Sequence, residues 1–300
     1  ATLTGNAFES NRYGIVAADK SAVEIQKCNF EGTGFRQTQQ VIIGSFPVSI
    51  IGQGSTGTIR NTIINNSSPY GVSVFSGGTA TLEEVEIYGT RATGLLVGDR
   101  SGPSGHVEVK RCKFNRNTTG VGVCAGASAN LQESECRENN DGILVIDRDS
   151  QLKLVKTTIA SNKDYGLYVH GNAQAEVIDS DIQANGRGAQ SGTSRKSAEH
   201  GSLRLEDSRI GGNRVFGVGV ATQSELILNR CVFDGTDKTN VHKESGGVLQ
   251  TDMVAETSPA PDATAEPKTE RNQARRKSTP SQDSRRRADE LNRILRQFRP

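Results

Sequence analysis

The sequence predicts an all-β fold, a solenoid of about ten coils over residues 1–250. A short motif, one glycine followed by an apolar strand, returns at intervals of 22 to 29 residues from Gly71 to Gly217. Units of this length must stack, because none of them can bury a core alone. Within each unit apolar residues occupy every second position, which is the period of a strand and not of a helix. The repeated glycines are Gly14, Gly71, Gly94, Gly120, Gly142, Gly166, Gly188 and Gly217.

Two rows of inward-facing side chains follow from this alternation. In one unit, for example, Val107, Val109, Cys112 and Phe114 are predicted to face the interior. The Leu-x-x-Leu-x-Leu frame of a leucine-rich repeat is missing. The first row holds small residues, namely Cys28, Thr62, Val85, Cys112, Ser134, Thr157, Ser180, Ser208 and Cys231. Two residues further on, the second row holds Phe30, Ile64, Ile87, Phe114, Cys136, Ile159, Ile182, Ile210 and Phe233.

An asparagine recurs three residues after the second row, where the chain is predicted to turn. Side chains stacked about 4.8 Å apart can hydrogen-bond along the stack, as amide ladders do. We therefore predict a structural role for Asn11, Asn117, Asn139, Asn162, Asn185 and Asn213.

With these glycine, aliphatic and asparagine stacks, residues 1–250 resemble the right-handed parallel β-helix repeat proteins, the pectate-lyase-like superfold. The resemblance implies a right-handed parallel β-helix but no single function, because relatives include polysaccharide lyases, hydrolases and epimerases as well as binding and scaffold domains. The Asp-Pro-His-Asp motif of alginate epimerases, the Arg-x-Pro-x-x-Arg motif of pectate lyases and the Gly-His-Gly motif of polygalacturonases are missing. No catalytic residue is carried over from those families.

Charge divides the chain unevenly. Residues 268–300 contain eleven Lys/Arg and four Asp/Glu, a net charge of +7, whereas residues 1–250 contain 25 bases and 26 acids, a net charge of −1. Nucleic acid or an anionic surface is therefore expected to bind only through the basic tail. Residues 251–287 are polar and are predicted to form a disordered linker. No apolar run is long enough to span a membrane, and we expect the solenoid to be part of a larger protein.

The end of the tail, residues 288–299, predicts a short basic amphipathic helix. Its apolar stripe has the spacing i, i+3, i+4 and i+7. A matching apolar strip is predicted on the solenoid, because Leu96, Leu144 and Ile146 should point outward after the repeated glycines. An exposed apolar strip is typical of an interface, so it could receive this helix or another protein. The stripe consists of Leu291, Ile294, Leu295 and Phe298.

The five cysteines have neither disulfide nor zinc spacing and are predicted to be small core residues, except that Cys124 should point outward. We predict no bound metal and no cofactor. Asp179 and Asp181 look like a catalytic acid pair, but outward charges alternate in sign from coil to coil and should pair across strands. Asp179 next to Asp207 breaks this alternation, and Arg209 is expected to compensate.

Insertions at 98–105 and 189–201 lie about four coils apart and predict a cleft between them. A base and a cation in one cleft are what a lyase or epimerase of uronic-acid polymers would need. The same residues would also occur in a polar turn or as solvated side chains, and aromatic platforms for sugars are scarce.

We therefore predict a domain that binds a protein or glycan partner, with a carbohydrate-active enzyme as the alternative. The candidate ligand-binding residues are Asp147, Arg148, Asp149, Tyr168, His170, Arg195, Lys196 and His200, with His106 on the rim.

Overall fold

A computed structural model describes residues 1–9, 14–32, 47–100, 102–193, 200–234, 239–252 and, for the backbone only, 255–257. Residues 1–257 form one compact unit. It is an all-β, right-handed parallel solenoid of about 10 turns, and its described residues contain no helix. The predicted fold class is thus confirmed. The stack runs to Thr257, past residue 250, and the predicted helix at 288–299 lies outside the described residues.

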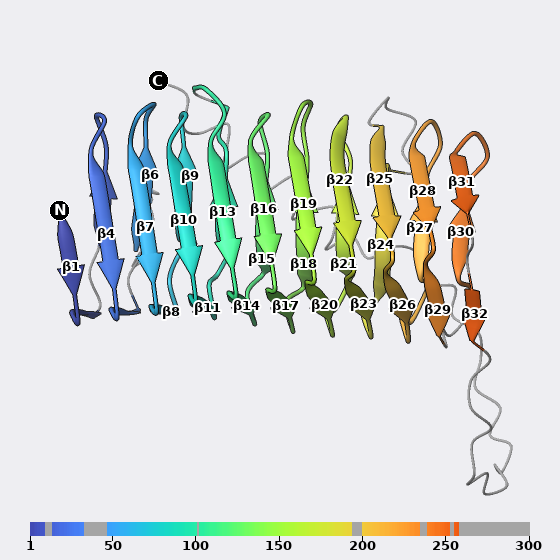
Figure 1. The fold of residues 1–300 in the computed structure, drawn as a ribbon, viewed down its shortest axis with the longest axis horizontal. Coiled ribbons are helices and arrows are strands. Elements are labelled where there is room, and N and C mark those ends of the chain that lie inside the picture. Colours follow the sequence, from blue (N-terminus) through green and yellow to red (C-terminus); the bar gives the residue numbers. More distant parts are fainter. Residues whose placement is uncertain are drawn as a thin grey trace, which may run out of the picture. The chain divides into compact units, whose positions relative to one another are not determined.

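Three parallel sheets form the walls of the solenoid, and each coil contributes one strand to each sheet in turn (Figure 1). Sheet 1 consists of β1 (Thr2–Thr4), β4 (Ala22–Gln26), β7 (Thr56–Arg60), β10 (Thr79–Glu83), β13 (His106–Lys110), β16 (Ser128–Gln132), β19 (Gln151–Val155), β22 (Ala173–Ile178), β25 (Gly201–Glu206), β28 (Glu225–Asn229) and β31 (Val248–Asp252). Sheet 2 consists of β2 (Ala7–Glu9), β5 (Asn29–Glu31), β8 (Ile63–Asn65), β11 (Glu86–Tyr88), β14 (Lys113–Asn115), β17 (Glu135–Arg137), β20 (Thr158–Ala160), β23 (Asp181–Gln183), β26 (Arg209–Gly211), β29 (Val232–Asp234) and β32 (Ala255–Thr257). Sheet 3 consists of β3 (Ile15–Ala17), β6 (Val48–Ile51), β9 (Tyr70–Phe75), β12 (Thr93–Val97), β15 (Thr119–Val123), β18 (Asp141–Val145), β21 (Tyr165–Val169), β24 (Arg187–Ser191), β27 (Val218–Val220) and β30 (Val241–Lys243).

The interior is built from the predicted rows. Cys112 and Phe114 are buried in the same cluster as Val107 and Val109 from sheet 1 and Val121 from sheet 3. All members of the small-residue row and of the second row are buried. Equivalent residues of neighbouring coils lie in register, as Ile87, Phe114 and Cys136 do. Alternation therefore predicted the core correctly.

The asparagine ladder is continuous from Asn117 to Asn213, and Asn11 lies outside the described residues. At its centre, the Asn162 Oδ1 accepts hydrogen bonds from the backbone N–H and the Nδ2 of Asn139, both at 3.0 Å. The Asn162 Nδ2 in turn donates to the Asn185 Oδ1 at 2.9 Å and to the Cys136 carbonyl at 3.1 Å. Each buried amide thus hydrogen-bonds backbone groups where the chain turns after a strand of sheet 2.

The repeated glycine has a steric cause. A Cβ at Gly120 would lie 2.5 Å from the carbonyl oxygen of Gly142, and a Cβ at Gly142 would lie 2.5 Å from that of Gly166. Each glycine therefore lets the backbone of the next coil approach closely beside the asparagine ladder. The glycine recurs in the sequence because this close contact between backbones recurs in the coils.

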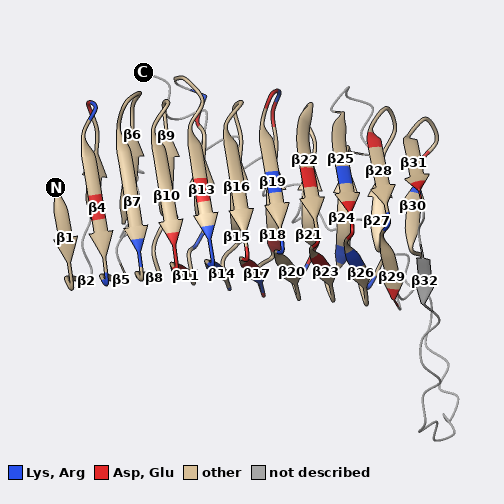
Figure 2. Cartoon of the chain, in the orientation of Figure 1, with Lys and Arg blue, Asp and Glu red and all other residues tan. Residues whose placement is uncertain are grey.

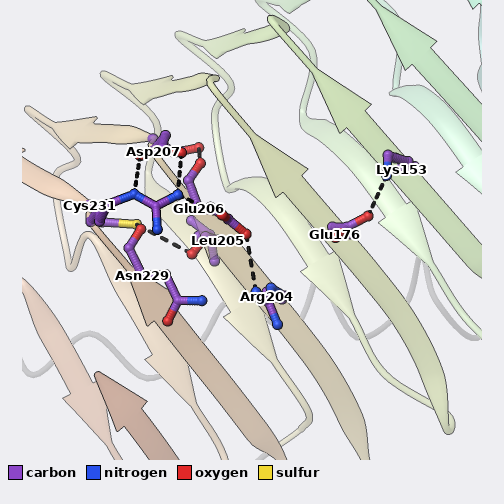
Figure 3. A network of polar contacts seen from close by, with 10 residues as sticks. Lys153, Glu176, Arg204, Leu205, Glu206, Asp207, Asn229 and Cys231 are labelled. Atoms are coloured by element: carbon purple, nitrogen blue, oxygen red, sulfur yellow. Dashed lines mark hydrogen bonds and ion pairs between the residues drawn. The ribbon is translucent and has the colours of Figure 1, made fainter. Parts of the chain in front are cut away.

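Acidic and basic residues are interspersed along the strands and turns of the solenoid (Figure 2). Arg230 binds Glu206 and Asp207, each at 2.6 Å, and Figure 3 shows both carboxylates in this network. The expected compensation of Asp179 by Arg209 is wrong, because Arg209 forms its ion pair with Asp234 in the next coil. An arginine side chain is long enough to reach carboxylates on several neighbouring coils. It pairs with the carboxylate that gives the best hydrogen-bond geometry, which need not be the one that the outward row of charges places nearest.

All five cysteines are buried as free thiols, and burial raises the pKa of Cys112 to about 11 and that of Cys124 to about 12. Because the thiolate is the reactive form, we expect native protein to react very slowly with a thiol reagent at neutral pH. These thiols stabilise the fold fully below their ordinary pKa of 9.0, and this contribution is lost as pH rises through 11 to 12. Thiol counting before and after denaturation checks this. Rapid labelling of the native protein would contradict it.

Candidate functional site

The structure brings two of the predicted site residues together at the end of β21, where Tyr168 lies in the strand and His170 directly follows it. The rings of Tyr168 and His170 lie 4.6 Å apart, and Tyr165 stacks on Tyr168 with a centroid distance of 4.5 Å. The Arg187 guanidinium lies 4.9 Å from the centre of the Tyr165 ring, and burial raises the pKa of Tyr165 well above its ordinary value. Tyr165 is therefore part of an aromatic row with Tyr168 and His170 on the outer side of sheet 3.

The other predicted site residues have separate environments. Asp147 pairs with Arg100 across two coils at 2.7 Å. Arg148 and Asp149 are exposed in the turn before β19. The His200 Nδ1 donates to the carbonyl of Gln223 at 2.6 Å. Arg195 and Lys196 lie outside the described residues, so a shared cleft remains a prediction.

Of the three residues predicted to form an exposed apolar strip, Leu96 and Ile146 are buried and Leu144 is half-buried. Leu96 and Ile146 are only 1% and 5% exposed although they lie outside the core cluster, and Cys124 is also buried. The expectation of an exposed strip was therefore wrong at these positions. One reason is that Leu96 folds over Gly122, whose added Cβ would lie 3.1 Å from the Leu96 Cδ1. The role of these residues as an interface stays a prediction, since Leu291, Ile294, Leu295 and Phe298 lie outside the described residues.

An open surface of a different kind runs along the outer face of sheet 1. Two adjoining hollows of about 440 Å³ and 400 Å³ lie over strands β10 to β28. They share Asn130 and Lys153, so they form one shallow groove across several coils. We call it the sheet 1 groove.

The floor of the sheet 1 groove is a row of polar side chains set by the strand register. Its central row reads Glu108, Asn130, Lys153, Glu176 and Arg204. The Asn130 Nδ2 donates to the Glu108 Oε1 at 2.7 Å, and Lys153 binds Glu176 at 2.7 Å (Figure 3). These exposed contacts contribute little to stability and can be exchanged for ligand contacts.

Two further amides lie on this face. Gln151 and Gln174 lie side by side and are exposed, and no hydrogen bond joins either side chain to another described residue. Sequence reasoning missed this face because it sought the site in the loops. The signal was present in segments such as "SANLQ" and "AQAEV", where polar or charged residues alternate with apolar ones.

A third hollow, of about 400 Å³, lies on sheet 2 around Tyr88. The Asn65 Nδ2 donates to the Tyr88 hydroxyl at 2.9 Å, and Ile63 on the neighbouring strand is 43% exposed. Arg116 and Arg137 complete its wall. An aromatic ring is thus accessible on a second face.

Among the described residues, no group of three or more His, Cys, Asp or Glu side chains is arranged to hold a metal ion. None of the described residues forms a helix long and apolar enough to cross a membrane.

Known proteins that are similar to this chain share its fold. The chain matches the family profile described as "Right handed beta helix region" over residues 1–156, 48–200 and 139–252. No curated protein matches the sequence. Among solved structures, it is similar to the Dettilon tailspike protein (gp208), with 15% identity, a TM-score of 0.58, and coverage of 86% of this chain and 56% of that chain. This chain thus spans little more than half of the tailspike.

Two further solved structures are similar at the same level. A double mutant of the periplasmic alginate epimerase AlgG has 15% identity, a TM-score of 0.55, and coverage of 85% of this chain and 69% of that chain. Pectate lyase Pel9A has 14% identity, a TM-score of 0.52, and coverage of 88% and 80%. Identities this low indicate a shared fold and carry no residue-level correspondence.

Proposed function

This chain belongs to the right-handed β-helix family, and from that premise we propose that it binds an extended polysaccharide along the sheet 1 groove. The observation that carries the proposal is the polar row from Glu108 to Arg204, which crosses five strands at a spacing of about 4.8 Å. A regular series of amides, carboxylates and cations suits a repeating polymer that presents hydroxyl groups at intervals.

The chemistry of the groove favours a glycan over a protein partner. Protein interfaces usually have an apolar core with aromatic anchors, whereas no described residue that lines the sheet 1 groove is aromatic and polar or charged side chains run along its floor from Glu108 to Arg204. Lys153 and Arg204 would let it accept a polymer with carboxylate groups, and Gln151 and Gln174 would serve any sugar hydroxyl. That the similar structures include an alginate epimerase and a pectate lyase supports this choice by analogy.

We expect the double variant Lys153→Ala/Gln174→Ala to bind its polysaccharide about tenfold more weakly or worse, because two hydrogen-bonding groups are lost at about 1 kcal/mol each. Isothermal titration of the full chain with alginate, polygalacturonate and a neutral glucan measures this. The matched control is Lys163→Ala/Gln183→Ala, which removes the same groups outside the groove. Equal weakening by both variants, or no binding to any of the three polymers, would refute the proposal.

A lyase or epimerase acting on uronic-acid polymers is the second candidate. It is favoured by the presence of cations and of His106 on the same face of sheet 1. Incubation with alginate or polygalacturonate distinguishes the two, since a lyase produces an unsaturated sugar that absorbs in the ultraviolet and an epimerase changes the proton spectrum of the polymer. Binding of an anionic surface or nucleic acid by residues 268–300, and docking of the predicted helix on the solenoid, remain separate predictions.

A further inference from the structure

Three side chains on the floor of sheet 1 form a hydrogen-bonded chain. His106 on β13 and Ser128 on β16 are direct neighbours across the sheet, and the His106 Nδ1 lies 2.7 Å from the Ser128 Oγ. The other ring nitrogen, Nε2, lies 2.8 Å from the Glu108 Oε1. Both Ser128 and Glu108 line the sheet 1 groove.

The chemistry of Glu108 fixes the direction of these hydrogen bonds. A carboxylate accepts and cannot donate, and its Oε1 also receives the Asn130 Nδ2 at 2.7 Å. Neutral His106 must therefore carry its proton on Nε2 and present a lone pair at Nδ1. The Ser128 hydroxyl consequently donates its proton to His106. A serine, a base and a carboxylate that orients the base are the parts of an activated nucleophile.

We propose that Ser128 is a nucleophile for ester hydrolysis, and that the natural substrate is an acyl ester, such as an acetyl group, on a glycan in the groove. The identity of this substrate rests on the proposed function, whereas the reactivity of Ser128 does not. Glu108 acts as a positioning residue through His106.

A donor for the developing oxyanion is available next to the nucleophile. Gln151 on β19 stands directly opposite Ser128 and is exposed. Its amide can point toward an ester carbonyl that Ser128 attacks, in the way that side-chain amides stabilise tetrahedral intermediates in other hydrolases.

The reaction balances with water alone. The Ser128 Oγ forms a bond to the ester carbonyl carbon while its proton moves to the His106 Nδ1. The C–O bond to the sugar then breaks, and the sugar hydroxyl leaves with that proton. Water next attacks the acyl-serine with His106 as base, which releases the carboxylic acid and restores Ser128.

The test uses the full chain with p-nitrophenyl acetate and, in parallel, a fluorophosphonate that labels activated serines. We expect Ser128→Ala and His106→Ala to lower kcat/KM by about 100-fold or more, and mass spectrometry to find the label on Ser128. Ser161→Ala is the matched control, since Ser161 is an exposed serine outside the sheet 1 groove. It should keep full activity and labelling at Ser128.

Two variants separate a catalytic site from a merely structural contact. With p-nitrophenyl acetate as substrate, Glu108→Gln should lower kcat and leave KM unchanged, because the replacement acts on this reaction through the orientation and charge of His106. Gln151→Ala should also act on kcat, since its donor serves the transition state. Circular dichroism confirms that each variant is folded.

Two results would overturn the inference. One is the absence of label on Ser128 in the wild-type protein. The other is a Ser128→Ala variant that keeps the wild-type rate while His106→Ala loses it, which means that the imidazole alone cleaves the ester. Polysaccharide binding by Ser128→Ala is measured separately by titration. In the wild-type protein, glycan binding without esterase activity would refute this inference and leave the proposed function standing, whereas esterase activity without glycan binding would do the reverse.

Discussion

Replacing Asn162 by alanine is expected to lower the free energy of unfolding by about 2–4 kcal/mol, since each buried group left without a partner costs about 1–3 kcal/mol. The Asn162 side chain accepts two hydrogen bonds from Asn139 and donates to Cys136 and Asn185. Alanine removes all four, leaves the buried backbone N–H of Asn139 without its partner, and takes one hydrogen bond from the Cys136 carbonyl in β17. Urea denaturation of the full chain followed by circular dichroism measures the change, with the m-value unchanged.

Asn130→Ala is the control for this experiment. Asn130 lies on the outer face of sheet 1 and its side chain makes a single hydrogen bond, to Glu108. Its replacement should change stability by no more than about 0.5 kcal/mol. Asn139→Ala should behave like Asn162→Ala. If the ladder variants melt like the control, the asparagine stack does not stabilise the solenoid.

The fold could be predicted because its causes are local and repeated. Alternation placed Cys112 and Phe114 inside, and one turn signal per coil placed the asparagines in a single column. If the inward and outward residues of one coil had been assigned wrongly, the equivalent residues of the neighbouring coils would have disagreed with that assignment. The ion pairs of long charged side chains do not repeat from coil to coil, so the sequence offered no such check, and Arg209 was assigned to the wrong carboxylate.

The candidate site was less predictable, because it depends on register between coils of unequal length. Lys153 and Glu176 look like ordinary solvated residues within their own strands. They become neighbours only when the coils are stacked. The same is true of His106 and Ser128, which are 22 residues apart in sequence and 2.7 Å apart in space. Burial of Leu96 depended on how its side chain bends over Gly122, and no sequence pattern encodes that.

The second large effect is expected from one strand that contains two glycines with opposite surroundings. In β15, a Cβ at Gly120 would lie 2.5 Å from the carbonyl oxygen of Gly142 and 3.0 Å from the Asn139 Nδ2. Neither group can retreat, because the carbonyl belongs to the next coil and the amide belongs to the ladder. Gly120→Ala should therefore push two coils apart and lower the free energy of unfolding by about 3 kcal/mol or more, the upper range for overpacking.

Gly122, two residues further along the same strand, is the control position, because an added Cβ there would meet side chains and not backbone. A Cβ there would meet the Leu96 Cδ1 at 3.1 Å and the Thr93 Cγ2 at 3.3 Å, both of them ends of side chains that can shift. Gly122→Ala should change stability by less than about 1 kcal/mol, since a small steric cost is offset by the lower entropy of the unfolded chain. Parallel urea titrations of the two variants measure the difference. Equal losses would mean that glycine is required throughout the strand for its backbone freedom, whereas a large loss at Gly120 alone indicates that the close approach of successive coils selects the repeated glycine.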